Sequence, residues 1–153
     1  MNLRVLRLFY CLLCVSLTTI SVGHTQNSVR DAELQIERLL RDAISYYENL
    51  EIDPMEDSLE RILNIERRFG PATPRMAKDI SQAHIYKGLL VSLQDSRNTQ
   101  GIKRYFIKAI EINDQAQMSS SIRTPTLSRI FEDARRQARP RNNGYAAGGG
   151  YNN

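Results

Sequence analysis

The chain has 153 residues, with 21 basic and 17 acidic side chains and only two cysteines, Cys11 and Cys14. This length is enough for one compact domain or a few stacked repeats, and it excludes an assembly of several large domains. Because both cysteines lie near the N-terminus, the rest of the chain cannot form a disulfide-stapled fold. Lipid attachment at Cys14 is not expected, because Leu13 stands where a lipoprotein signal needs a small residue.

The first 23 residues have the order of a secretory signal peptide. Arginines precede an uncharged run over residues 8–20, and the small residues Ser21 and Gly23 follow. We expect residues 1–23 to be cleaved, which leaves a periplasmic or secreted protein that begins at His24. An uncleaved membrane anchor is the alternative, although a spanning helix needs about 20 apolar residues and this run is shorter.

Charge is divided unevenly along the expected mature chain. Residues 24–66 contain 11 acidic and 4 basic side chains, a balance of −7, whereas residues 67–153 contain 15 basic and 6 acidic side chains, a balance of +9. Such a division could guide an acidic partner or an anionic surface to the C-terminal half. The alternative is that the charges only solvate the outer faces of helices.

Apolar residues recur at helical spacing through most of the chain and predict an all-α fold. The segment from Met76 to Leu93 is apolar on more than one side, so its helix is expected to be central. No stretch alternates between apolar and polar residues with turn signals at both ends, and we expect no strands. The predicted helices cover residues 29–50, 53–69, 75–94, 101–114 and 125–138.

Residues at the expected helix ends are typical of caps and stops. Asp53 offers a capping carboxylate, with Glu56 three residues later as its capping-box partner. Thr73 and Thr124 are each followed by a proline, which suits the first helical turn. Gly70 precedes another proline and is expected to end the second helix.

Gly88 and Ala109 are small residues within otherwise bulky helical stripes, which indicates that two helix axes approach to about 8–10 Å there. Together with Phe106, they make residues 83–114 resemble the tetratricopeptide repeat (TPR), a helix-turn-helix unit of about 34 residues. The resemblance implies antiparallel helical hairpins stacked in a right-handed array over residues 24–139. The segment from Ser121 resembles the capping helix of small exported repeat proteins of deltaproteobacteria. A plain helical bundle is the alternative.

The resemblance also implies a concave surface lined by the first helix of each pair. The residues expected to bind a partner there are Gln82, Ile85, Leu89 and Ser92. The alternative for Ile85 and Leu89 is that both belong to the core, because their helix must also pack on the preceding hairpin.

A second expected site is the basic patch of Arg135, Arg136, Arg139 and Arg141. Arginine clusters bind phosphate groups or nucleic acid, but an exported protein rarely meets nucleic acid, so an anionic envelope surface or an acidic protein is the expected contact. Cations near a helix C-terminus also stabilise the helix dipole, which is the default explanation. The following residues, 140–153, are rich in glycine, asparagine and tyrosine and are expected to be a disordered tail.

Motifs of catalysis are absent from the sequence, and we expect neither an enzyme nor a cofactor. The histidine within the third helix, His84, is expected to be a hydrogen-bonded packing residue. The carboxylate pairs Glu33 with Glu37 and Glu56 with Glu60 are one helical turn apart, but without further oxygen ligands they are expected to be solvated rather than metal-binding.

The expected function is therefore a small periplasmic, cell-envelope adaptor or scaffold that binds another envelope protein or peptide. The second hypothesis is an envelope-attached structural protein that acts through its basic C-terminal segment and its tail. A hydrolase that depends on His84 is the third. The sequence leaves the oligomeric state, the partner and the biological process open.

Overall fold

The computed structural model describes residues 20–138, with side chains described from Ser28 onward. This part of the chain contains α-helices and one short 3-10 turn but no strand, which confirms the all-α prediction. The expected signal core and the tail lie outside the described residues. The elements are α2 (Ile20–Glu48), α3 (Ile52–Phe69), α4 (Pro74–Gln94), α5 (Thr99–Ile112), η1 (Ser120–Ile122) and α6 (Pro125–Gln137).

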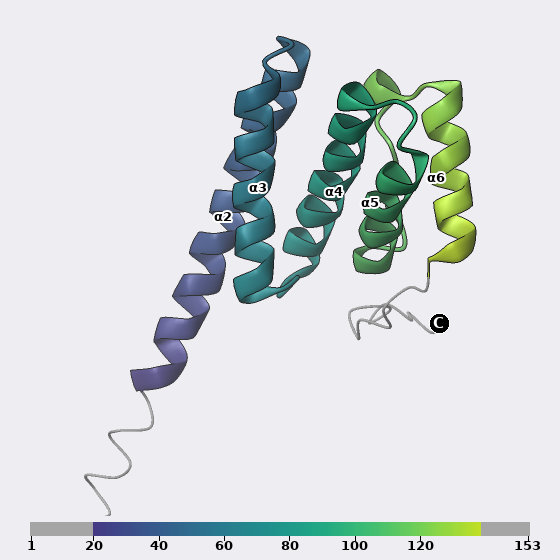
Figure 1. Cartoon of the computed structure of the whole chain (residues 1–153). Helices are drawn as coiled ribbons and strands as arrows, with labels where there is room; N and C mark the ends of the chain where they lie inside the picture. Colours follow the sequence, from purple (N-terminus) through teal and green to yellow (C-terminus); the bar gives the residue numbers. More distant parts are fainter. Residues whose placement is uncertain (1–19, 139–153) are drawn as a thin grey trace, which may run out of the picture.

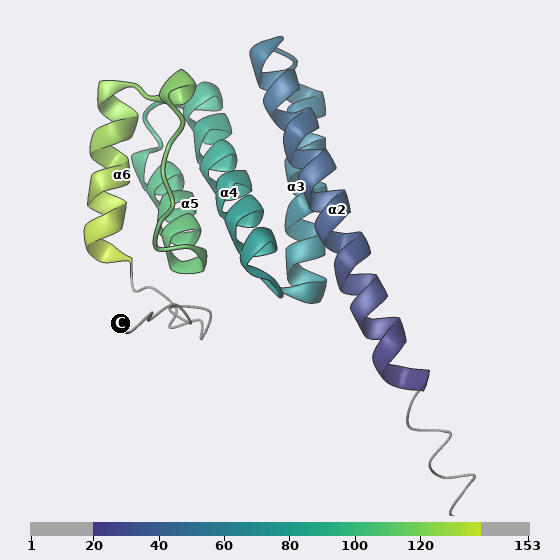
Figure 2. The same ribbon diagram turned by 180° about the vertical axis from the view of Figure 1, so that it is seen from behind.

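The helices lie side by side, and α2, α3, α4 and α5 alternate in direction, whereas α6 runs in the same direction as α5 because the chain between them returns to the other end of the bundle (Figures 1 and 2). The most extensive contacts are those of α4 with α5 and of α2 with α3, so consecutive helices form two hairpins. Helix α4 also contacts both α2 and α3, which joins the hairpins, and α6 packs on α5. Helix α4 is therefore the central element, as its sequence predicted.

Polar residues cap three of the helices. Thr73 Oγ1 accepts a hydrogen bond from the Met76 backbone N–H at 3.0 Å, and Thr124 caps α6 in the same way through the N–H of Leu127. Asn98 caps α5, which begins at Thr99 rather than at Gly101. These side chains satisfy backbone donors that have no partner inside the helix.

The predicted cap of the second helix is wrong. Helix α3 begins at Ile52, with Glu51 at the N-cap position and no side-chain hydrogen bond, so Asp53 lies inside the first turn. Glu56 does not complete a capping box, because its carboxylate accepts hydrogen bonds from Lys87 and Gln94 of α4 instead. Gly70 ends the helix with a φ of 61°, as predicted.

The predicted close approach at Gly88 and Ala109 is confirmed. A Cβ at Gly88 would lie 2.7 Å from Phe106 Cε1, so only glycine fits the contact between α4 and α5 without displacing the ring. Ala109 is fully buried, and its carbonyl oxygen accepts a hydrogen bond of 2.9 Å from the buried Ser81 hydroxyl.

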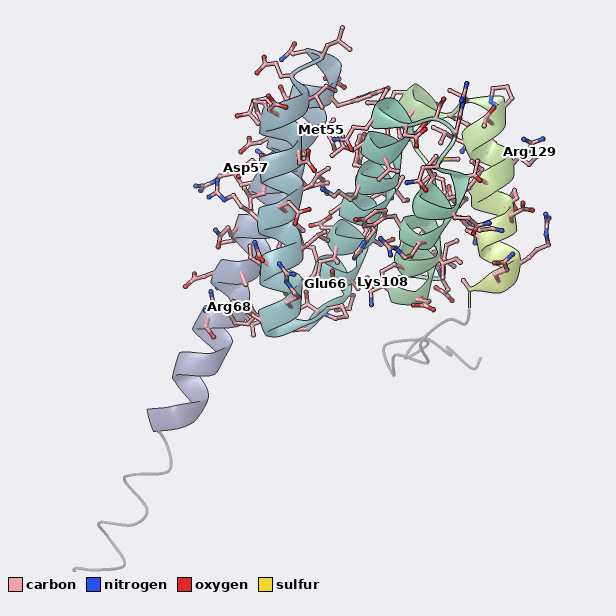
Figure 3. All side chains as sticks on the ribbon, viewed as in Figure 1. Met55, Asp57, Glu66, Arg68, Lys108 and Arg129 are labelled. Atoms are coloured by element: carbon pink, nitrogen blue, oxygen red, sulfur yellow. The ribbon has the colours of Figure 1, made fainter. Side chains whose placement is uncertain are left out.

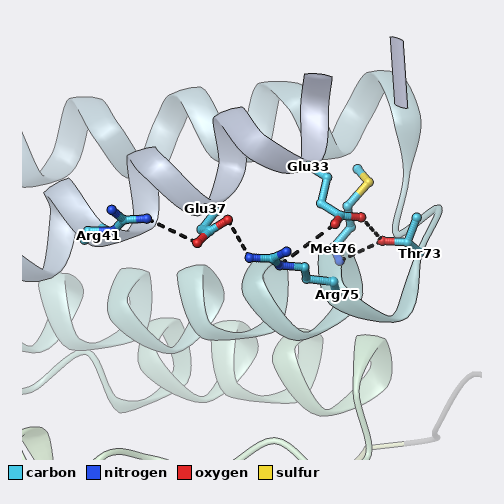
Figure 4. Close-up of polar contacts among 6 residues, drawn as sticks. All are labelled: Glu33, Glu37, Arg41, Thr73, Arg75 and Met76. Atoms are coloured by element: carbon cyan, nitrogen blue, oxygen red, sulfur yellow. Dashed lines mark hydrogen bonds and ion pairs between the residues drawn. The ribbon is translucent and has the colours of Figure 1, made fainter. Parts of the chain in front are cut away.

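Helix α2 is tied to the start of α4 by a polar network (Figure 4). Glu33 accepts a hydrogen bond from the capping hydroxyl of Thr73 at 2.5 Å. Arg75 donates to Glu37 at 2.6 Å, and Glu37 also pairs with Arg41. These contacts hold the first turn of α4 against the outer helix of the preceding hairpin.

Between residues 20 and 138, the molecule has no helix with the length and apolar character needed to cross a bilayer. Helix α2 begins at Ile20, so the cleavage point expected after Gly23 lies near its start.

Candidate functional site

The four residues predicted to bind a partner lie on α4, but two of them are not accessible. Ile85 and Leu89 are buried in the hydrophobic core, which agrees with the alternative interpretation of these two positions. Gln82 and Ser92 are partly exposed. Gln82 Nε2 donates a hydrogen bond of 3.0 Å to the backbone oxygen of Gln117, so its amide already has a partner within the chain.

Gln82 is bound by the segment between α5 and α6, residues 113–124, which we call the α5–α6 connection. It returns along the bundle on the side seen in Figure 2. Ala116, Met118 and Ile122 of the connection are buried. The connection thus forms part of the core on this side of the molecule and is not a free loop.

Arginine side chains fix the backbone of the connection. Arg135 of α6 donates to the carbonyl oxygens of Asp114 and Ala116, at 3.1 and 2.6 Å. Arg123, near the end of the connection, donates to the carbonyl oxygen of Met118 at 3.0 Å. Because these hydrogen bonds go to main-chain oxygens, they hold the connection in position whatever side chains it carries.

A groove lies on the other side of the bundle, where α3, α4 and α5 meet; we call it the α3–α5 groove. One part has a volume of about 460 Å³ and an adjoining part about 410 Å³, and the two parts share His84, Tyr105 and Lys108. Figure 3 shows Glu66 and Lys108 next to each other on this side. The two parts are lined by Glu60, Leu63, Glu66, Arg67, Gly70, Pro71, His84, Arg104, Tyr105, Ile107, Lys108 and Glu111.

His84 forms the floor of the groove. Its Nε2 lies 2.8 Å from a carboxylate oxygen of Glu66, while its buried Nδ1 has no hydrogen-bond partner. Lys108 Nζ approaches the same carboxylate only to 4.0 Å. His84 therefore packs with one hydrogen bond and links α4 to α3, as expected from the sequence.

One helical turn along α4, Lys87 makes a second link to α3. Its ammonium lies 2.9 Å from Glu56 and 2.6 Å from Glu60, although its side chain is only 7% exposed. Burial acts to lower the pKa of Lys87, but the two carboxylates outweigh it and raise the pKa overall. The hydrogen bond from Lys87 in turn lowers the pKa of Glu56.

The α5 rim of the groove combines an aromatic ring with cations that lack close carboxylate partners. The Arg104 guanidinium lies 5.7 Å from the centre of the Tyr105 ring, within cation–π range. No carboxylate among residues 28–138 lies within ion-pair distance of Arg104, although Glu111 also lines this part of the groove. The groove beside Ile107 is mainly apolar. This arrangement suits a ligand that carries both an apolar group and negative charge.

The structure describes only half of the predicted basic patch. Arg135 is used inside the molecule, on the carbonyls of the α5–α6 connection and over the Phe131 ring. Arg136 hydrogen-bonds to Asp133 of its own helix. Arg139 and Arg141 lie outside the described residues.

The carboxylate pairs considered for metal binding face cations instead. Glu33 and Glu37 contact Arg75, and Glu56 and Glu60 share Lys87. Within residues 20–138 no group of three or more histidine, cysteine, aspartate or glutamate side chains is arranged to hold a metal ion.

The α3–α5 groove was not predicted from the sequence. Its only local signal was the outer face of α5, where Arg104, Tyr105 and Lys108 alternate with the buried stripe. No family model matches this chain, and neither a curated protein nor a solved structure is significantly similar to it.

Proposed function

We propose that this protein is an exported, TPR-like adaptor of the cell envelope that binds another protein through the α3–α5 groove. The two helical hairpins, the close approach at Gly88 and the additional helix α6 support a stacked array with a capping helix. The proposed role is binding rather than catalysis, because the polar groups near His84 serve helix packing.

We choose the α3–α5 groove because the two sides of the central helix α4 differ. On one side, the α5–α6 connection occupies Gln82 and contributes buried residues to the core. On the other side, the groove is open and has an aromatic ring, an apolar residue and cations at its rim. Such a combination is typical of protein interfaces, which are rich in tyrosine and arginine.

Site-specific photo-cross-linking in intact cells tests this assignment. A photoreactive amino acid at Tyr105 should yield a cross-linked product with an envelope protein. The same amino acid at Thr126, which is exposed on α6, serves as the control and should yield none. Products from Gln82 but not from Tyr105 would place the binding surface on the side of the α5–α6 connection and contradict the proposal.

The second candidate remains a structural protein that attaches through its basic segment and tail. The internal contacts of Arg135 and Arg136 make their part of the patch less suited to this role. Removal of residues 140–153 separates the candidates: an adaptor that uses the groove keeps its cross-linked partner, whereas a tail-driven protein loses it.

A further inference from the structure

The turn between α2 and α3 carries a leucine in an unfavourable conformation. Leu50 has a φ of 61° and is 79% exposed. Backbone hydrogen bonds from Leu50 to Tyr47 O and from Glu51 to Tyr46 O close the end of α2 in the Schellman pattern, which favours glycine at the position of Leu50. The side chain therefore contributes little to the fold and occupies a position where glycine or asparagine would be less strained.

Acidic residues surround this leucine. Glu48, Glu51 and Asp53 are all exposed. No basic residue occurs between Arg41 and Arg61 in the sequence. We call residues 48–53 the hairpin tip, which has one exposed aliphatic side chain and three exposed carboxylates.

The α3–α5 groove has the complementary chemistry. The part beside Ile107 and Tyr105 is mainly apolar, and its rim carries two cations, Arg104 and Lys108, against one carboxylate, Glu111. Burial of one leucine in such a groove is favourable, and opposite charges at the rim guide the approach and fix the orientation.

We propose that the hairpin tip of one copy docks into the α3–α5 groove of a second copy, so that chains associate head to tail. Contact within one copy is excluded by position, since the tip lies at one end of α3 and Glu66 and Lys108 lie toward the other end (Figures 1 and 3). Each copy uses its tip on one neighbour and its groove on the other, so the assembly keeps one free tip at one end and one free groove at the other, which is the geometry of an open, extendable assembly. The proposal rests on the groove being a recognition surface, as in the proposed function, and the groove left free at the end of the assembly is the one that receives another protein.

Sedimentation analysis of the protein, purified from cells in its naturally processed form, tests the proposal. The average mass should rise with protein concentration and fall again in about 1 M salt, where the screening length is about 3 Å. Leu50→Asn, which suits the left-handed turn, should weaken association about tenfold or more. Arg104→Glu should weaken it through the groove, whereas Arg129→Glu on the exposed surface of α6 should not change it (Figure 3).

A mixture of the two variants is the decisive measurement. The Leu50→Asn chain retains its groove and the Arg104→Glu chain retains its tip, so the mixture should form dimers at concentrations at which each variant alone is mainly monomeric. Self-association that survives in both single variants would overturn the proposal and point to the tail. A monomeric wild-type protein that still cross-links to another protein through Tyr105 would also overturn it, while leaving the adaptor function intact.

Discussion

The two sides of helix α4 differ in whether another segment of the chain covers them. On the side of Gln82 and Tyr86, the chain supplies its own cover, and the α5–α6 connection brings Met118 into the core. On the side of His84 and Lys87, the helix is linked to α3 by polar contacts and borders an open groove. A surface that is expected to bind a partner can therefore be covered by another segment of the same chain, so that the accessible surface lies on the opposite side.

The largest expected effect comes from removing an anchor of the covered side. Met118→Ala deletes a buried side chain, and we expect the free energy of unfolding to fall by about 2–5 kcal/mol because a cavity remains. Urea denaturation followed by circular dichroism measures the change. Gln115→Ala in the same connection is the control, since Gln115 is exposed. An unchanged midpoint for Met118→Ala would mean that the connection is not part of the core.

On the groove side, Lys87→Met keeps the apolar stem but removes the ammonium that Glu56 and Glu60 share. We expect a loss of about 1.5–3 kcal/mol near neutral pH, limited by the partial exposure of both carboxylates. Lys78→Met on the exposed surface of α4 should have little effect.

The pH dependence of that loss follows from the direction of the pKa changes. Because the pKa of Lys87 is raised on folding, its contribution is complete below the ordinary lysine pKa and disappears as pH rises through the folded value. Because the pKa of Glu56 is lowered, its contribution is present above the ordinary glutamate pKa and disappears as pH falls through the folded value. The difference between wild type and Lys87→Met should therefore be greatest between these limits; a difference independent of pH would argue against the ion pairs.

Gly88→Ala tests the contact between α4 and α5. Alanine favours a helix, but its Cβ would meet the buried Phe106 ring, so we expect a net loss of about 1–2 kcal/mol. Thermal unfolding measures it. The double variant Gly88→Ala with Phe106→Leu should recover part of the stability that Phe106→Leu alone loses. Stabilisation by Gly88→Ala in the wild-type background would show that the ring can move aside.

The smallest expected effect concerns the side of α4 that faces α2. Burial is the main cause of the raised pKa of Asp79, so folding penalises its ionised form. Asp79→Asn should raise the free energy of unfolding near neutral pH by less than about 1 kcal/mol, and this gain should shrink as the solution is acidified and Asp79 itself becomes protonated. A loss of stability would indicate that attraction to Arg75 exceeds the burial penalty.

Local sequence signals predicted the helices well, because helix formation depends on spacing and on end residues. Thr73 and Thr124 cap the helices that they were expected to cap. The prediction failed at Asp53 and Glu56, where Lys87 of another helix competes for the carboxylate and the helix begins earlier. The capping-box pattern includes only residues that are close in sequence, so it cannot account for a lysine from another helix.

The candidate site was less predictable than the fold. Helical spacing put Ile85 and Leu89 on one side of α4, but the same spacing serves a groove or a core. The buried residues of the α5–α6 connection were not assigned a role, because Ala116 and Met118 belong to no periodic pattern. Tyr105 and Lys108 became a site only when α3 packed beside them.

By itself, the sequence determined that the chain is helical, where α4 and α6 begin, which small residues allow α4 and α5 to approach, and how charge divides between the halves of the chain. Tertiary structure alone decided which side of α4 is covered, which carboxylates hold Lys87, and where Leu50 and the groove lie relative to each other. The reason is physical: backbone periodicity and caps act over a few residues, whereas burial and ion pairing depend on groups that are distant in sequence and meet only after folding.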